Sequence, residues 1–180
     1  MTNPADPIGR AFIKTSSEFL ADDYLPKIER CLEQLDDDQI WWRPNQQSNS
    51  IGNLVLHLCG NARQWIVSTL GGHGYQRNRD AEFAQRDIID QQELMLLVRQ
   101  TVRDVCNVLE SFNPESLFDR HLIQGSEVDA LYAIFHVVEH FSMHTGQILL
   151  ITKMLTDKDL RLYNFSTGKP VQTWREPTAE

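Results

Sequence analysis

Three histidines recur at intervals of four residues inside one long apolar stretch, DALYAIFHVVEHFSMHTGQILLITKML. An α-helix places residues four apart on neighbouring turns, with Cβ atoms roughly 5–6 Å apart. His136, His140 and His144 would therefore line one side of a helix. Two imidazoles at this spacing can hold one metal ion through bonds of about 2.0–2.1 Å. An earlier helical stretch, SIGNLVLHLCGNARQWI, contributes His57 in a similar setting. The pattern predicts a helical bundle with a three-histidine metal site inside it.

Four amphipathic stretches predict the helices of this bundle. They run from about residue 8 to 34, from 51 to 70, from 90 to 112 and from 126 or 127 to 155. Ser50 and Asp90 are suitable N-caps, and the pair Gly71 and Gly72 is a suitable helix end. Pro26 lies inside the first stretch, so we expect it either to kink that helix or to divide it in two.

The segments between these helices lack a clear helical pattern. Residues 36–47 are expected to form a connection, and residues 71–87 a long loop of the kind that is more often functional or mobile than incidental. Residues 118–127 are expected to be irregular or to include a short extended piece. The polar tail, residues 156–180, contains three aromatic residues that could hold it against the bundle: Tyr163, Phe165 and Trp174.

Together these features predict an all-α protein. The expected fold is a four-helix bundle with helices in up-down-down-up order and a long crossover loop between the second and third helices. A length of 180 residues suits one domain. We expect residues 1–180 to form that domain, with a core at about 8–155 and a tail at 156–180.

Composition and charge narrow the class of protein. The formal net charge is −8 and the pI is about 5.2, which disfavours nucleic-acid binding because an acidic surface repels phosphate backbones. No apolar run reaches the roughly 20 residues that span a bilayer, and the N-terminal sequence lacks the pattern of a secretory signal. Cys31, Cys59 and Cys106 show no close pairing, so reduced thiols and a cytoplasmic location are expected.

The geometry of a helix limits how many of the clustered histidines can share one ion. Each step of four residues rotates by about 40°, so three histidines at this spacing do not stay on one line, and the third should turn aside. Neutral imidazole suits zinc, nickel and iron. Three protein ligands leave an open coordination position, as in catalytic rather than structural zinc sites. Because the ligands must be neutral, metal affinity should fall as the pH drops below about 6.5.

The same residue types have less specific explanations. A histidine on its own is usually a satisfied core or surface residue, and we expect this of His73 and His121. The clustered histidines could instead form a hydrogen-bonded core group without metal. Glu139 precedes His140, so the motif is not the HExxH of zinc proteases, and we expect a solvated or supporting carboxylate. Ser-His-Asp catalysis stays open, although no G-x-S-x-G motif is present.

The combination of SIGNLVLHLCGN with HVVEHFSMHTGQI resembles the DinB-like superfamily, also described as YfiT-like metal-dependent hydrolases. The resemblance covers about residues 8–155, and the element H-x-x-x-H-x-G-Q is its most specific part. It implies a four-helix bundle, often homodimeric, in which three histidines hold a divalent metal. Matched by position, those ligands are His57, His140 and His144, whereas His136 matches a frequent non-ligand histidine.

Two functional hypotheses follow. In the first, the protein is an enzyme in which a zinc, nickel or iron ion activates water or a low-molecular-weight thiol for attack on a small-molecule substrate, as a hydrolase or thiol S-transferase. In the second, it is a non-catalytic dimeric module that binds a metal or a ligand in a stress response. Residues expected to support the ligands or line the pocket are His136, Asn61, Gln64, Trp65 and Gln147. Cys59 lies about 200° around the helix from His57, so we expect it to point into the core.

Overall fold

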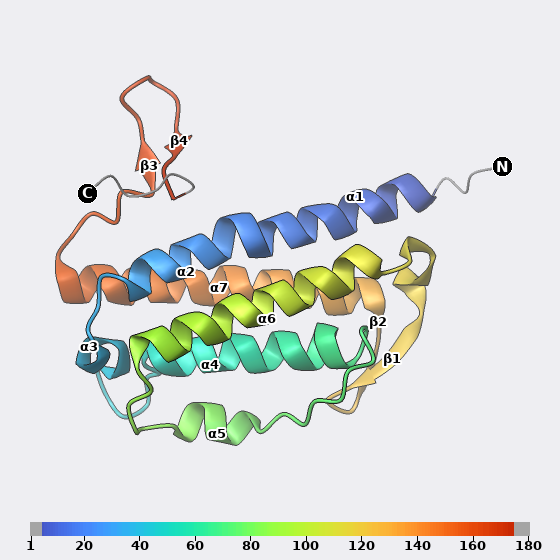
Figure 1. The fold of residues 1–180 in the computed structure, drawn as a ribbon, viewed down its shortest axis with the longest axis horizontal. Coiled ribbons are helices and arrows are strands. Elements are labelled where there is room, and N and C mark those ends of the chain that lie inside the picture. Colours follow the sequence, from blue (N-terminus) through green and yellow to red (C-terminus); the bar gives the residue numbers. More distant parts are fainter. Residues whose placement is uncertain (1–4, 175–180) are drawn as a thin grey trace.

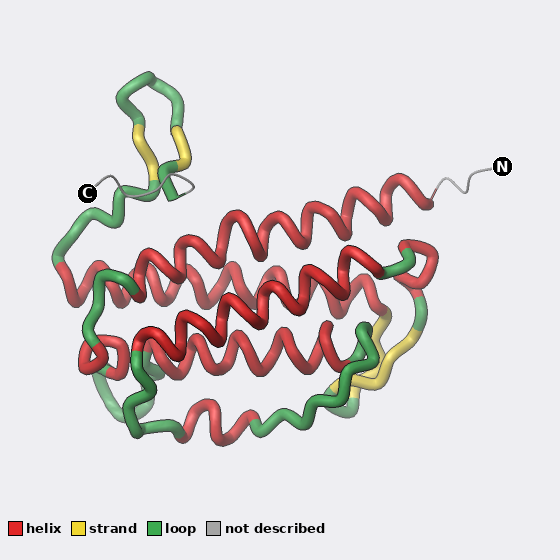
Figure 2. The backbone as a smooth tube through the Cα atoms, in the orientation of Figure 1, coloured by secondary structure: helices red, strands yellow, loops and turns green. Residues whose placement is uncertain are grey.

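Helices make up most of the chain in the computed structural model, which describes residues 5–174 (Figure 1). The helices are α1 (Ala5–Glu18), α2 (Leu25–Leu32), α3 (Asp37–Trp41), α4 (Ile51–Ala62), α5 (Arg79–Ala84), α6 (Gln91–Ser111) and α7 (Ala130–Thr156). Two π-helical segments and one 3-10 helix accompany them: Phe19–Tyr24, Arg63–Ser68 and Pro114–Phe118. The strands are β1 (Arg120–Ile123), β2 (Ser126–Asp129), β3 (Tyr163–Asn164) and β4 (Val171–Gln172). They form two antiparallel pairs, β1 with β2 and β3 with β4 (Figure 2).

Four long helical stretches pack side by side, which confirms the predicted all-α four-helix bundle (Figure 1). In Figure 1, α1–α2 and α7 run toward the end of the bundle where α3 lies, whereas α4 and α6 run away from it. Because α4 and α6 point the same way, the chain must return along the outside of the bundle between them. That returning stretch, residues 71–90, is called the crossover segment here; it contains α5, which packs against α4.

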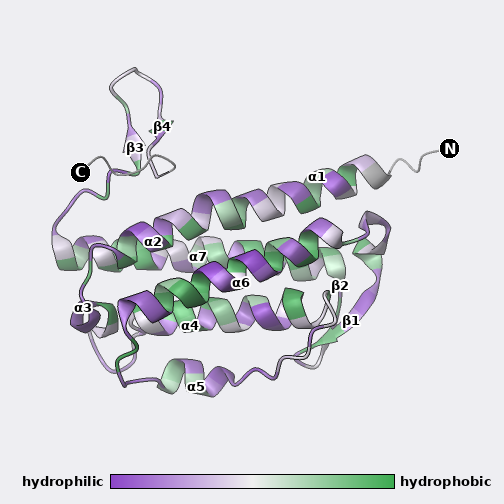
Figure 3. Ribbon diagram, viewed as in Figure 1, coloured by the Kyte–Doolittle hydropathy of each residue, from purple (hydrophilic) through white to green (hydrophobic). Residues whose placement is uncertain are grey.

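The core lies along the common axis of the four stretches. Each contributes a side chain without measurable exposure: Ile28 from α2, Leu58 from α4, Leu94 from α6 and Phe141 from α7. Along α6, green and purple bands alternate in Figure 3, as expected for a helix that presents one apolar face to a core. Burial of apolar surface on this scale is the main force that holds the bundle together.

The first helical stretch continues past Pro26 instead of ending there. Pro26 occupies the first turn of α2, where its missing N–H costs no hydrogen bond. The π-helical segment Phe19–Tyr24 directly precedes α2 and absorbs the irregularity that proline imposes on a helix. The sequence did not decide whether Pro26 kinks the helix or divides it in two. The structure shows a wide helical turn between two regular helices.

Two segments expected to be loops contain short helices. Residues 36–47 include α3, which Asp36 caps by accepting a hydrogen bond from the backbone N–H of Gln39 at 2.8 Å. The crossover segment includes α5, whose first turn is capped by Asn78. Both capping residues were visible in the sequence. Helices of five and six residues are too short to give a periodic apolar pattern.

The last long helix begins at Ala130, a few residues later than expected. Residues 126–129 form β2, and their pairing with β1 removes them from the helix. Asp129 then caps α7 by accepting a hydrogen bond from the backbone N–H of Tyr132 at 2.7 Å. The short extended piece expected within residues 118–127 is thus a β-hairpin.

The described part of the tail is fastened by one of the three aromatic residues expected to hold it. Trp174 is buried, and its Nε1 donates a hydrogen bond to the carbonyl of Asp22 at 3.0 Å. The guanidinium of Arg30 donates to three tail carbonyls. Tyr163 and Phe165, in contrast, are exposed, which corrects the expectation for these two.

The expectations about membrane-spanning segments and about cysteines can be compared with the structure directly. Within residues 5–174, no helix combines the length and apolar character needed to cross a membrane. All three cysteines are free thiols, as expected from their spacing.

Candidate metal centre

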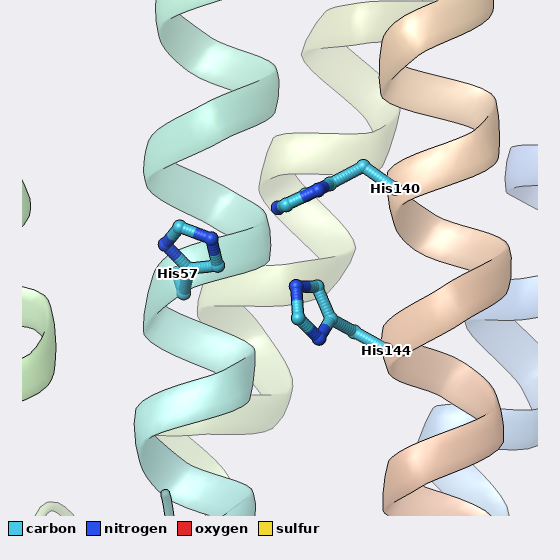
Figure 4. Close-up of side chains that lie close together, drawn as sticks. All are labelled: His57, His140 and His144. Atoms are coloured by element: carbon cyan, nitrogen blue, oxygen red, sulfur yellow. The ribbon is translucent and has the colours of Figure 1, made fainter.

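The structure brings together the three histidines that the sequence singled out. His57 on α4 faces His140 and His144 on α7, and the three rings point toward one another between the two helices (Figure 4). The ring centroid of His57 lies 4.8 Å from that of His140 and 5.3 Å from that of His144; the last two are 4.4 Å apart. One nitrogen from each ring lies within 4.8 Å of the others. This spacing fits three ligands around one cation.

Helix α4 is positioned by its N-terminus. Ser50 and Asn53 form a capping box, in which the Ser50 hydroxyl accepts from the backbone N–H of Asn53 at 3.1 Å. The amide of Asn53 also donates to the carbonyls of Glu82 and Gln85, at 2.9 and 3.2 Å. One residue therefore both begins α4 and fastens α5 to it, which places Glu82 beside His57.

A buried ion pair from the crossover segment contacts the outer side of His57. Glu82 Oε2 lies 2.9 Å from His57 Nδ1. The guanidinium of Arg77 donates two hydrogen bonds to the same carboxylate, from Nε to Oε1 at 2.7 Å and from Nη2 to Oε2 at 2.8 Å. Arg77 Nη2 also lies 3.0 Å from His57 Nδ1, but a guanidinium cannot accept a proton. A proton on Nδ1 therefore goes to Glu82, and this tautomer leaves Nε2 of His57 with a free lone pair.

The other two rings also keep a nitrogen free. His144 Nδ1 lies 2.6 Å from the side-chain oxygen of Gln147, an acceptor, so Nδ1 donates and Nε2 is left unprotonated. His140 Nε2 is buried and has no hydrogen-bond partner among the described residues. A buried nitrogen without a partner costs free energy, and native structures keep few such groups. A cation would satisfy all three nitrogens at once, so these residues fit a metal ion.

The charge states agree with this role. Burial and, to a smaller extent, the neighbouring His144 and His57 lower the pKa of His140 to about 3. Burial also lowers the pKa of His144, although its hydrogen bond with Gln147 acts in the opposite direction. Metal-binding histidines must be neutral. His140 stays neutral well below pH 6.5, and the pKa of His144 is also below that of a free imidazole, so protons compete for these two ligands at a lower pH than expected.

The carboxylate behind His57 is ionised. Burial alone would raise the pKa of Glu82, but its hydrogen bonds with Arg77 and His57 outweigh that effect and lower the pKa below its usual value. The pair of Arg77 and Glu82 is thus a neutralised ion pair, with Glu82 acting as the acceptor for the imidazole N–H. Carboxylates in this position commonly orient metal-bound histidines.

The remaining histidine of the row on α7, His136, turns aside, as the rotation of the helix predicted. The ring of His136 lies 5.4 Å from that of His140, but its Nε2 pairs with the side-chain amide of Asn61 at 3.2 Å. Trp65 packs against His136 with 4.2 Å between ring centroids. Asn61, Trp65 and His136 therefore form the next layer between α4 and α7.

The other residues that the sequence suggested near the site differ in where the structure places them. Gln147 contacts His144 directly, whereas Gln64 lies next to Arg77, at 3.3 Å, and contacts none of the three clustered histidines. Cys59 is buried in the core, and burial raises the pKa of its thiol to about 12, in line with the expected orientation away from His57. Glu139 is exposed, as expected of a solvated carboxylate.

Sequence reasoning missed Arg77, Glu82 and Phe83. The Phe83 ring packs on His57 with centroids 4.5 Å apart. All three lie in the crossover segment, about 20 to 26 residues after His57 along the chain. No local pattern relates them to His57. The N-cap Asn78 could have indicated α5, but not the surface that α5 covers.

The fold is that of DinB-like proteins. A DinB-like protein from Bacillus subtilis superposes with a TM-score of 0.61 at 18% identity, over 81% of this chain and 94% of that chain. A protein described as conserved, from Enterococcus faecalis, gives 0.66 at 16% identity, over 81% of this chain and 97% of that chain. The resemblance seen in the sequence is thereby confirmed at the level of the fold. The chain belongs to the family described as "Protein of unknown function (DUF1572)", whose pattern matches residues 7–169. A comparison with curated proteins found no match.

Proposed function

We propose that this protein is a metal-dependent enzyme of the hydrolase or thiol S-transferase type. His57, His140 and His144 would hold one divalent cation, with zinc, nickel and iron as the candidates. One observation carries the proposal: three buried imidazoles from two separate helices lie together, each with a free nitrogen. The substrate would be a small molecule that binds at the ion.

A divalent cation in such a site supplies a Lewis acid and lowers the pKa of a bound water or thiol. The protein residues determine what surrounds it. Imidazoles bind in their neutral form and add no charge, and Arg77 offsets the charge of Glu82. Among the described residues, no cysteine or carboxylate joins the three histidines as a ligand. The site therefore favours an anionic fourth partner, and this supports hydrolysis or thiol transfer.

Metal content tests the proposal. After purification without chelators or a metal-affinity step, elemental analysis should find about one divalent ion per chain. The loaded protein should then turn over either activated esters and amides, or a thiol together with a small electrophile. A chain that is metal-free as purified, binds no added zinc, nickel or iron, and folds unchanged in chelator would contradict the proposal.

A second candidate is a non-catalytic metal-binding module. The low exposure of the three rings, 5% for His57 and 9% for each of His140 and His144, favours it because a substrate has little room to reach the ion. Metal bound at one ion per chain, with no turnover over a broad panel of esters, amides, thiols and electrophiles, would support the module over the enzyme. The free thiols fit a reducing compartment for either, such as the cytoplasm.

We further propose that the protein is a homodimer formed through the outer face of α7. Four large apolar side chains on this helix are exposed: Phe135, Met143, Leu150 and Met154. At 100° per residue they fall within an arc of about 100°, which also contains the exposed charged residues Glu139 and Lys153, and exposed apolar side chains gathered on one face of a helix mark interaction sites.

Light scattering coupled to size-exclusion chromatography should therefore give twice the 20.8 kDa of one chain. Leu150→Glu should produce monomers, because it buries a charge in the interface. Leu122→Glu is the matched control, since Leu122 is an exposed leucine on β1, away from α7, and it should leave the dimer intact. A monomeric wild type would contradict the proposal.

A further inference from the structure

We infer that Arg77 and Glu82 of the crossover segment are positioning residues for the metal site, which fix the tautomer and orientation of His57 and thereby set the affinity for metal. The inference rests on the proposed metal site but assigns a role to residues outside it. It explains why a polar pair is buried on the outer side of α4, where an apolar contact would otherwise be expected.

Both oxygens of the Glu82 carboxylate accept hydrogen bonds from buried side chains. Oε1 accepts from Arg77 Nε, and Oε2 accepts from both Arg77 Nη2 and His57 Nδ1. A paired Arg–carboxylate contact fixes the plane of the carboxylate as well as its position. The carboxylate cannot rotate away from His57 without breaking that pair, so the imidazole has one favourable orientation and one favourable proton position.

The surroundings prevent the pair from rearranging. The side chain of Arg77 is 3% exposed and that of Glu82 is 9% exposed. Gly60, on α4, provides the room for the carboxylate, because a Cβ added there would lie 1.9 Å from Glu82 Oε1. Phe83 packs on the His57 ring, and Asn53 holds the backbone of Glu82 through its carbonyl.

Two consequences follow for metal binding. A free imidazole divides its population between two tautomers and rotates, whereas His57 presents Nε2 toward His140 and His144 before any ion arrives. Partners of this kind typically change metal affinity by 10–100-fold. Glu82 contacts the Nδ1 side of His57 and does not belong to the group of ligand atoms that lie together, so the open position of the three-histidine site is preserved.

The test uses the full chain, with zinc alone as the probe. Zinc affinity is measured by competition with a chromophoric chelator for the wild type, Glu82→Gln and Gly60→Ala. Glu82→Gln removes the negative charge of the carboxylate and keeps the shape of the side chain. Gly60→Ala displaces the carboxylate by its added methyl group and leaves Arg77 and Glu82 chemically intact. Both should bind zinc 10–100-fold more weakly. The control is Glu110→Gln, which removes an exposed carboxylate of α6 and should stay within about twofold of the wild type.

A second readout does not require zinc. Nitrogen-15 chemical shifts of the His57 ring in the metal-free wild type should show Nδ1 protonated and Nε2 unprotonated, and Glu82→Gln should lose this single tautomer. A wild-type His57 protonated at Nε2, or folded variants that bind zinc as tightly as the wild type, would overturn the inference. A wild type that binds no zinc at all would instead contradict the proposed function, so the two failures are distinguishable.

Discussion

Replacing His140 by leucine should lower zinc affinity by more than about a hundredfold while leaving the metal-free protein at least as stable as the wild type. The loss of affinity should exceed the 10–100-fold typical of an outer hydrogen-bond partner, because a ligand itself is removed. Stability should not fall, because no protein group among the described residues satisfies the buried Nε2 of His140. An unsatisfied buried polar group costs about 1–3 kcal/mol, and an apolar side chain of similar size removes that cost.

Chelator competition gives the affinity, and urea unfolding in the presence of EDTA gives the free energy of unfolding. His136→Leu is the matched control, a histidine one turn earlier on α7 that pairs with Asn61. It should keep zinc affinity within about tenfold of the wild type. If His140→Leu retained wild-type affinity, or lost several kcal/mol of metal-free stability, His140 would be a structural residue rather than a ligand.

The metal-free protein should lose stability as the pH falls below 6.5, to an extent set largely by the buried histidines. Burial lowers the pKa of His140 to about 3 in the folded chain, against an unfolded value near 6.5. Between these values the unfolded chain binds the proton and the folded chain does not, so the free energy of unfolding decreases as the pH decreases. The contribution of His140 is complete above pH 6.5, and its loss amounts to about 1.4 kcal/mol per pH unit below that.

Urea unfolding in EDTA at several pH values measures this effect. From pH 6.5 to pH 5, where most carboxylates stay ionised, His140 alone should account for about 2 kcal/mol. His140→Leu should reduce the dependence by that amount. His73→Leu, which removes an exposed histidine, controls for the loss of a histidine as such. Identical pH profiles for wild type and His140→Leu would contradict the low pKa of His140 and the burial that causes it.

Much of the bundle could be predicted from local sequence signals. Ser50 and Asp90 cap the helices they were expected to cap, because a side chain that satisfies the backbone N–H groups two or three residues later acts within one turn. The apolar stripe of α6 predicted its buried face, since periodicity in sequence becomes position around a helix. The short helices α3 and α5 escaped prediction, and the β1–β2 hairpin was expected only as irregular chain or a short extended piece, because too few residues repeat in these elements.

Local sequence signals also predicted the three histidines of the candidate site, but more directly for His140 and His144 than for His57. His140 and His144 are one turn apart, so their proximity is a property of the helix itself. His57 was placed with them only by its inward-facing stripe and by the resemblance to DinB-like proteins. That its ring meets theirs depends on how α4 packs against α7.

The sequence by itself determined the helices, the fold class and the set of histidines that could serve as ligands, because all of these depend on interactions within a few residues. Only the tertiary structure decided that Arg77 and Glu82 stand behind His57, that His140 Nε2 is left without a partner, and that burial keeps His140 neutral. These properties arise from contacts between segments far apart in the chain and from exclusion of water. No local pattern encodes them.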